Sequence, residues 1–422
     1  MLDVAPKESE WLSWFYALLV SAIIFCTVPL ARAIQSGVAN QFGREFFLYI
    51  VSVVGAIGGL AAIKVIRKRR VSRQAYFWLA GVGVVYSIYL YVLRANPEET
   101  VHFVEYGALS LLVYRALLHR IRDNSIYITA ALIVGIVGLV DEWLQWLAPN
   151  RVWDLRDVRI NVVAGALIQV SIAAGLRPAL VSGWPSGTSL RRLFHVAAAA
   201  LFLLGLCYVN TPERIATYAT RIPALSFLMS RKSMMIEYGY LYRDPAIGVF
   251  RSRFTREELA INDRNRGAEV ARVLDVYITE EMYDRFQEVY SVPNDPYIHE
   301  VGIHLFGRNR NLRNAKKKEP RPSRHYDIAY RENQILEKYF PTSLTESRHR
   351  WSRQLRKQVG EMADTSSVYE SRVSAGLITR FTERQVLLGY GAAIVAMLLL
   401  AAVFGGRRKI GANRRTSDNR DG

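Results

Sequence analysis

Cysteine is nearly absent from this chain of 422 residues. The two that occur, Cys26 and Cys207, both lie inside apolar runs, and the polar stretch that begins near residue 210 contains none. A disulfide framework, a CxxC redox pair and a cysteine-ligated zinc site are therefore excluded.

Acidic residues are also scarce: the chain has 37 Asp and Glu against 55 Lys and Arg, which gives a net charge of +18. In a soluble protein this excess would indicate nucleic-acid binding. Residues 211–384, however, supply only 30 − 23 = +7 of it. The other 25 − 14 = +11 belongs to a region of long apolar runs, where Lys and Arg collect in cytoplasmic loops. The charge therefore follows membrane topology, and no nucleic-acid partner is expected.

Long apolar runs exclude a wholly soluble globule, because several reach the roughly 20 residues that a membrane-spanning helix needs. The first run follows Asp3, Glu8 and Glu10 and is too long for a secretory signal, so it predicts an uncleaved span. The sequence predicts eight spans, near residues 12–31, 46–64, 76–93, 101–117, 126–147, 158–176, 192–209 and 386–405.

Basic loops predict the orientation of these spans. The six Lys and Arg within residues 64–73 place that loop in the cytoplasm, and alternation places the basic residues of 115–122, 177–192 and 407–415 there too. Both termini are then cytoplasmic. The loops at 32–45, 94–100 and 148–157, and all of 210–385, are predicted to lie outside.

The fold class predicted is an all-α polytopic membrane bundle with an inserted extracytoplasmic α+β domain. Its parts are a seven-span bundle at 1–209, a soluble domain at 210–385, an eighth span at 386–405 and a basic cytoplasmic tail at 406–422.

Short patterns inside the soluble domain predict its elements. T-x-x-E at 255–258 and S-x-x-E at 343–346 predict capping boxes that open polar helices. Residues 234–241 and 301–306 partly alternate and predict strands. The charged, proline-containing segment 316–324 predicts a linker or loop.

Ionisable and amide side chains lie inside three predicted spans, although each ionisable group costs roughly 2.5–3.5 kcal/mol at mid-bilayer. Within each span their spacing of three or four residues places them on one helical face. They are His102, Glu105 and Tyr106 in the fourth span, Asp141, Glu142 and Gln145 in the fifth, and Asp157 and Asn161 in the sixth, with Arg151 in the preceding loop.

The predicted topology places all three polar groups at the outer end of the bundle, where they can converge in one outward-facing site. Adjacent carboxylates at Asp141 and Glu142 repel, so one is expected to be protonated or countered by His102 or Arg151. The alternative is a purely structural polar knot that holds the three helices together.

The same residues, in this order, resemble the VanZ-like family of bacterial membrane proteins over about residues 76–176. The motif is a histidine and Y-x-x-L (His102, Tyr106), D-E-x-x-Q (residues 141–145), a P-x-R loop (149–151) and D-x-x-x-N (157–161). This chain departs from the pattern at Leu144, where the family often has histidine, and at Asn150 and Ala164, where it has glycine. The family is named for a teicoplanin-resistance protein, so the resemblance implies a role in the cell envelope at the bacterial cytoplasmic membrane.

A second motif is a near miss for the H-E-x-x-H zinc site. His299-Glu300 is followed by His304, five rather than four residues after the first histidine, which places the rings ~140° apart on a helix or on opposite faces of a strand. No metal or other cofactor is therefore expected.

Three functions fit these observations. The first is an envelope protein that engages a lipid headgroup, a lipid-linked envelope precursor or a glycopeptide antibiotic through Tyr106, Gln145, Arg151, Asp157 and Asn161. The second is an intramembrane hydrolase or transferase acting on a lipid-linked envelope precursor, with Asp141 or Glu142 as general base and His102 as acid or metal ligand. In that enzyme Arg151 would hold an anion, and Glu105 is a further catalytic candidate. The third is a proton-coupled transporter with Glu105, Asp141 and Glu142 as its relay, which the apolar inner halves of the three spans disfavour. The sequence leaves open whether any reaction is catalysed.

Overall fold

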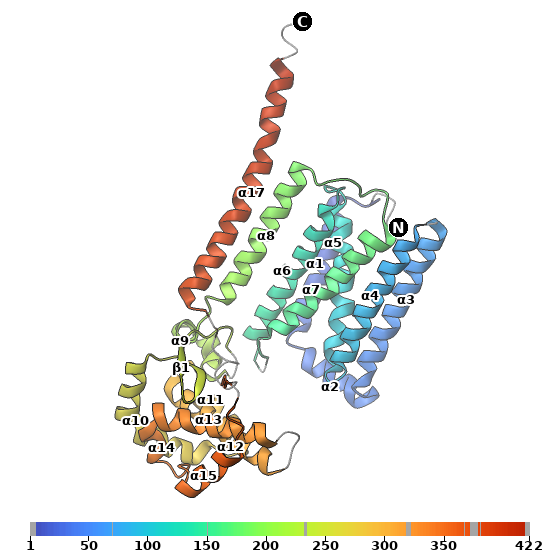
Figure 1. Cartoon of the computed structure of the whole chain (residues 1–422). Coiled ribbons are helices and arrows are strands. Elements are labelled where there is room, and N and C mark those ends of the chain that lie inside the picture. The colour runs from blue at the N-terminus through green and yellow to red at the C-terminus, as the bar shows by residue number, and fades with distance from the viewer. Residues whose placement is uncertain are drawn as a thin grey trace. The chain divides into compact units, whose positions relative to one another are not determined.

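The computed structural model describes residues 6–69, 71–149, 151–231, 234–317, 322–366, 368–371, 379 and 381–417. The chain divides into two compact units, unit 1 (Met1–Gly205 with Gly389–Gly422) and unit 2 (Leu206–Leu388). Long helices dominate unit 1, and shorter helices with one hairpin make up unit 2 (Figure 1).

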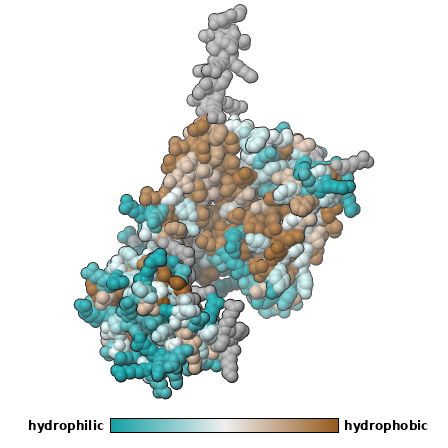
Figure 2. Space-filling model, viewed as in Figure 1, coloured by the Kyte–Doolittle hydropathy of each residue, from teal (hydrophilic) through white to brown (hydrophobic). Residues whose placement is uncertain are grey.

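Long apolar helices account for most of unit 1. Seven of the described helices are long and apolar enough to cross a membrane: α1, α3, α4, α6, α7 with its π-helical end, α8 and α17. They indicate a multi-pass membrane protein, and much of the exposed surface of this unit is apolar (Figure 2). The bounds are α1 (Glu10–Thr27), α2 (Ala31–Phe42), α3 (Glu45–Arg69), α4 (Arg73–Leu93), α5 (His102–Leu117), α6 (Ser125–Leu147), α7 (Leu155–Val170), its π-helical end (Ser171–Leu176), α8 (Gly187–Cys207) and α17 (Glu383–Ser417).

The remaining predicted span, 101–117, corresponds to α5, which is not among those seven. Its 16 residues measure about 24 Å at 1.5 Å per residue, less than the roughly 30 Å hydrocarbon core. A 3₁₀ turn, η1 (Pro97–Val101), precedes it. Because α5 packs against α1, α6 and α7, it lies inside the unit and buries Tyr106, Ser110 and Tyr114 completely.

The first span ends earlier than expected. Helix α1 ends at Thr27, just before Pro29, whereas the sequence predicted a span to residue 31. The predicted loop at 32–45 contains α2, a helix without buried residues. The segment was predicted as a loop because it connects two spans, but a helix pairs its backbone groups within the segment.

Two glycines let the central helices approach closely. A Cβ on Gly138 of α6 would lie 2.8 Å from the Cβ of Asn161 on α7, and one on Gly165 of α7 would lie 2.6 Å from a methyl of Val134 on α6. Helix α5 joins them through Ser110, whose hydroxyl donates to the carbonyl of Gly165 at 2.9 Å. The α5–α6–α7 core is therefore packed backbone to backbone, as small residues permit in membrane bundles.

Unit 2 is mainly helical, and the described residues contain a single two-stranded sheet. Antiparallel strands β1 and β2 pair Tyr242 with Phe250, and the Phe250 ring packs into an apolar core beneath α12 and α13. The elements are α9 (Pro212–Arg221), η3 (Pro223–Ser230), β1 (Tyr240–Asp244), β2 (Gly248–Ser252), α10 (Arg256–Tyr277), α11 (Tyr283–Val289), α12 (Pro296–Lys316), α13 (Pro322–Tyr339), α14 (Pro341–Thr345) and α15 (Arg353–Met362).

Two local predictions in unit 2 are wrong. Residues 301–306 form part of α12 rather than a strand, because the Asp295 side chain caps this helix and Pro296 occupies its first turn. Ser343 lies within α14 and does not open a helix, since its hydroxyl donates to Asp263 at 2.8 Å.

Other local predictions hold in whole or in part. The capping box predicted at 255–258 is confirmed at the start of α10. The strand predicted at 234–241 is present only from Tyr240 onward. Within the predicted linker 316–324, residues 318–321 lie outside the described residues, and those on either side belong to α12 and α13.

Close packing at Gly165 gives a testable prediction. Gly165→Ala should lower the free energy of unfolding by about 1–3 kcal/mol, because the added methyl overlaps Val134. Gly58→Ala on α3 is the matched control, since its methyl would meet nothing within 4 Å. Thermal unfolding in detergent measures both, and equal midpoints would contradict the proposed packing.

Candidate functional site

The sequence-predicted polar residues gather at the end of unit 1 where α5 and α7 begin and α6 ends. Two links bring these ends together: the Tyr106 hydroxyl donates to Asp141 at 3.0 Å, and Glu99 before α5 pairs with Arg156 of α7 at 2.6 Å. Residues from three helices therefore meet in one place, which we call the polar cluster: His102, Glu105, Tyr106, Asp141, Glu142, Gln145, Arg151, Asp157 and Asn161.

Two adjacent carboxylates form the centre of the polar cluster. Asp141 and Glu142 are 2% and 0% exposed. The amide nitrogen of Gln145 donates to both, at 3.2 Å to Asp141 and 2.9 Å to Glu142. One neutral amide therefore bridges two acids that would otherwise repel each other in a low-dielectric interior.

Arg151 reaches the acids only through Gln145. Its Nη2 donates to the side-chain oxygen of Gln145, and no ion pair joins it to Asp141 or Glu142 in the described part of the chain. The guanidinium thus polarises the bridging amide and keeps further N–H groups for another acceptor. This hydrogen-bonded contact is indirect, but the positive charge of Arg151 still attracts both carboxylates, as the sequence suggested.

His102 lies beside Glu105 rather than beside the central acids. Its Nδ1 is 3.7 Å from a Glu105 carboxylate oxygen and has no hydrogen bond. Among the described residues, neither a hydrogen bond nor an ion pair connects His102 with Glu142. Glu105 is half-buried, with about a third of its side chain exposed, so this pair lies at the edge of the polar cluster.

Asn161 is the least satisfied member of the polar cluster. It is completely buried, and within the described structure neither its amide oxygen nor its amide nitrogen has a hydrogen-bond partner. Asp157, one turn earlier on α7, is half-buried and close enough to Glu142 to repel its charge. Asp157 therefore adds negative charge near Glu142, and among the described residues no hydrogen bond joins Asn161 to either acid.

Five polar atoms of the cluster are buried without a partner among the described residues. Leaving such a group unpaired costs about 1–3 kcal/mol, and native proteins pair nearly all of them with protein, water or ligand. The atoms are Oδ1 of Asp141, Oε2 of Glu142, Nδ1 of His102 and both amide atoms of Asn161. These donors and acceptors therefore remain available to water or to a polar ligand group.

Sequence reasoning missed three buried polar residues beyond the cluster. Ser110 and Tyr114 follow Tyr106 at four-residue intervals along α5, and Gln169 on α7 donates to the Ser110 hydroxyl at 2.7 Å. Gln169 lies eight residues after Asn161, on the same helical face. The i, i+4 spacing was the available signal, but the inner halves of these spans were predicted to be apolar.

No metal centre emerges from the residues that the structure describes, where three His, Cys, Asp or Glu side chains do not gather closely enough to hold an ion. The two histidines of the near-miss motif both lie on α12, and each has a partner outside that helix. His299 binds the carbonyl of Tyr290 at 2.8 Å, and burial lowers its pKa to about 3. His304 contacts Glu332 at 2.5 Å, and although burial opposes it, this carboxylate raises the pKa of His304.

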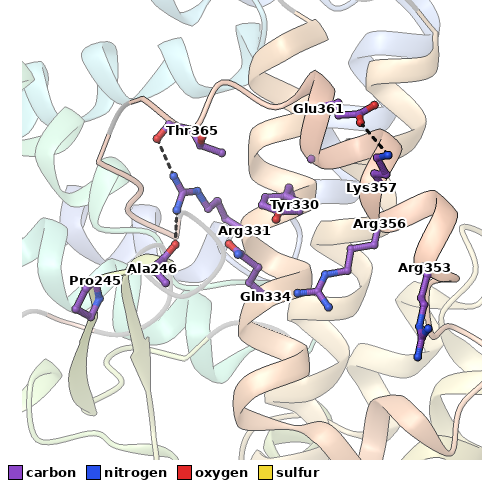
Figure 3. Close-up of a pocket in the computed structure, with 11 residues that line it drawn as sticks. Pro245, Ala246, Tyr330, Arg331, Gln334, Arg353, Arg356, Lys357, Glu361 and Thr365 are labelled. Atoms are coloured by element: carbon purple, nitrogen blue, oxygen red, sulfur yellow. Dashed lines mark hydrogen bonds and ion pairs between the residues drawn. The ribbon is translucent and has the colours of Figure 1, made fainter.

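Unit 2 contains an open hollow of about 890 Å³ beside α13 and α15 (Figure 3). Most of its basic side chains are already paired. Arg331 donates to the carbonyls of Ala246 at 2.6 Å and Thr365 at 3.0 Å, and Arg356 pairs with Glu337 at 3.2 Å. Arg331 therefore holds neighbouring backbone segments together on one side of the hollow, and the basic side chains of α15 line the other side. Since most of these cations already have partners, the hollow is a weaker candidate site than the polar cluster.

No family model, no curated protein and no solved structure matches this chain. The VanZ-like resemblance therefore rests on the motif residues alone, and the polar cluster must be interpreted from its own geometry.

The contact between Tyr106 and Asp141 gives a second prediction. A double-mutant cycle of Tyr106→Phe with Asp141→Ala should give a coupling energy of about 1 kcal/mol in detergent unfolding, because each change removes the same buried hydrogen bond. The control cycle pairs Tyr114→Phe with Asp141→Ala. Tyr114 lies two turns further along α5, so additive effects are expected there. Additivity in both cycles would show that Tyr106 and Asp141 are not in contact.

Proposed function

We propose that this chain is a VanZ-like multi-pass protein of the bacterial cytoplasmic membrane whose polar cluster engages the polar head of a lipid, a lipid-linked envelope precursor or a glycopeptide antibiotic. The observation that carries the proposal is the set of five unpartnered buried atoms. A purely structural knot would be expected to pair its own atoms, because each unmet group destabilises the fold.

The chemistry of the cluster suits a ligand with both hydroxyl and anionic groups. Asp141 and Glu142 each offer one free carboxylate oxygen to a hydroxyl or ammonium donor, and Asn161 offers an acceptor and a donor side by side. The remaining N–H groups of Arg151 suit a phosphate or carboxylate, which the planar guanidinium grips with two parallel bonds. Sugar, peptide and phosphate groups of envelope precursors have this combination.

The proposed orientation places both termini in the cytoplasm and unit 2 outside. Two ion pairs support it, since Glu8 pairs with Arg115 at 2.6 Å and Glu10 with Arg120 at 2.5 Å. They hold the start of α1 beside the basic end of α5, on the side that the positive-inside rule assigns to the cytoplasm. The polar cluster, at the opposite end of α5, then faces outward.

A proton relay is the second candidate function, because polar groups continue beyond the cluster. Ser110, Tyr114 and Gln169 extend the polar face of α5 and α7, and both the Tyr114 hydroxyl and the Gln169 oxygen lack partners among the described residues. The inner halves of these helices are thus less apolar than the sequence suggested. Buried polar side chains of this kind occur in proton pathways.

The orientation gives a third prediction. With Cys26 and Cys207 replaced, a cysteine introduced at the exposed Ser323 should react with an impermeant thiol reagent in intact spheroplasts, because α13 belongs to the unit placed outside. A cysteine introduced at the exposed Arg67, at the end of α3, is the control and should react only after lysis. The opposite pattern would invert the topology and turn the polar cluster inward.

A fourth prediction tests the anion-binding role of Arg151. Arg151→Lys keeps the positive charge but loses the planar fork, so the protein should be expressed while its effect on the teicoplanin susceptibility of the host falls at least tenfold. Arg159→Lys, at an exposed position on α7, is the matched control and should change neither. Full activity of a stably expressed Arg151→Lys protein would contradict ligand binding by Arg151 and favour the polar knot.

A further inference from the structure

A second feature of unit 1 lies at the opposite end of α5 from the polar cluster. Helices α1, α5, α6 and α8 enclose a groove of about 610 Å³ that is lined mainly by apolar surface. Trp14, Leu117, Ile133 and Val196 contribute apolar side chains, whereas Arg120, Arg191, Arg192 and His195 contribute basic ones. The groove therefore combines an apolar wall with cationic groups, at the level where α1 begins.

The positive charge in this groove is only partly compensated. Among the described residues that line it, Glu10 is the one acid, and it pairs with Arg120 at 2.5 Å. One guanidinium N–H of Arg192 donates to the backbone carbonyl of Arg120, at 2.8 Å. Arg191 has no side-chain hydrogen bond or ion pair with any described residue, and its side chain is exposed. Two guanidinium charges are thus left without an acidic partner.

Two hydrogen bonds fix the position of the loop that leads into α8, the helix that forms one wall of the groove. The backbone N–H of Ser186 donates to Asp123 at 3.1 Å, and that of Ser182 donates to the carbonyl of Arg122 at 3.0 Å. These bonds tie the loop before α8 to the loop before α6. Burial of the α8 apolar window is only 17%, against 50% for α6, so α8 diverges from an anchored base and leaves one side open to lipid.

We infer that this groove binds an anionic phospholipid, whose phosphate lies between Arg191 and Arg192 and whose acyl chain lies along Ile133 and Val196. Charge complementarity selects the occupant: basic pockets between membrane helices suit anionic headgroups, and the apolar wall suits a hydrocarbon chain and not a free ion. In the proposed orientation this lipid belongs to the cytoplasmic leaflet. The site is distinct from the polar cluster and independent of its ligand.

Titration of the detergent-purified full chain with dioleoyl phosphatidylglycerol and dioleoyl phosphatidylcholine, read by native mass spectrometry and thermal unfolding, tests the inference. The wild type should bind phosphatidylglycerol in preference, and Arg191→Gln should weaken that binding about fivefold. Adding Arg192→Gln should weaken it about fivefold more. The control Arg67→Gln/Lys68→Gln removes two exposed charges from the end of α3 and should leave the affinity unchanged.

A charge-neutral variant tests the acyl chain separately. Ile133→Trp narrows the groove without changing its charge, so it should also weaken phosphatidylglycerol binding, while the unfolding midpoint without lipid confirms that the variant is folded. Equal losses in the Arg191 and Arg67 variants, equal binding of both lipids, or displacement of the lipid by millimolar inorganic phosphate would each overturn the inference.

Discussion

The arrangement of the membrane bundle depends on keeping two adjacent carboxylates, Asp141 and Glu142, away from water. A buried charge is expensive in a low-dielectric interior unless something nearby compensates it. Here the compensation is mostly dipolar: the Gln145 amide donates to both acids, and the Tyr106 hydroxyl donates to Asp141. Within the described structure Arg151 forms no hydrogen bond with the acids and instead donates to the amide oxygen of Gln145. Bonds from α5 and from the loop before α7 thus converge on α6.

Close helix packing and the polar cluster are parts of the same arrangement. Gly138 lies one turn before Glu142 on α6, and the absence of a side chain there lets Asn161 approach from α7. A larger residue at Gly138 would separate the helices and move the Asn161 amide away from the acids. Gly165 does the same one turn further along α7, where its carbonyl also accepts the Ser110 hydroxyl. The small residues therefore set the position of the polar atoms.

Sequence patterns predicted most of the long apolar helices of unit 1, because run length and hydropathy depend on local composition. They also predicted which helix ends are polar, since a four-residue spacing puts Asp141 and Gln145 on one face whatever surrounds them. They could not predict partners. That Tyr106 donates to Asp141, or that Arg151 donates to Gln145 and forms no ion pair with the acids among the described residues, depends on how α5 and the loop before α7 pack against α6. Residues 301–306 show the same limit: their partial alternation favoured a strand locally, but in the fold α12 continues through Gly302, where the Phe286 ring occupies the place of a side chain.

The central claim is that the unpartnered atoms around Asn161 hold a polar ligand. The most direct test is mass spectrometry of the lipids and small molecules that co-purify with the full chain from its membrane, compared between wild type, Asn161→Leu and the control Gln169→Leu. Leucine fills nearly the same volume as either amide but cannot form hydrogen bonds. The account predicts a bound species in the wild type and in the Gln169 variant that is lost from Asn161→Leu. Identical bound species in all three folded proteins would contradict it.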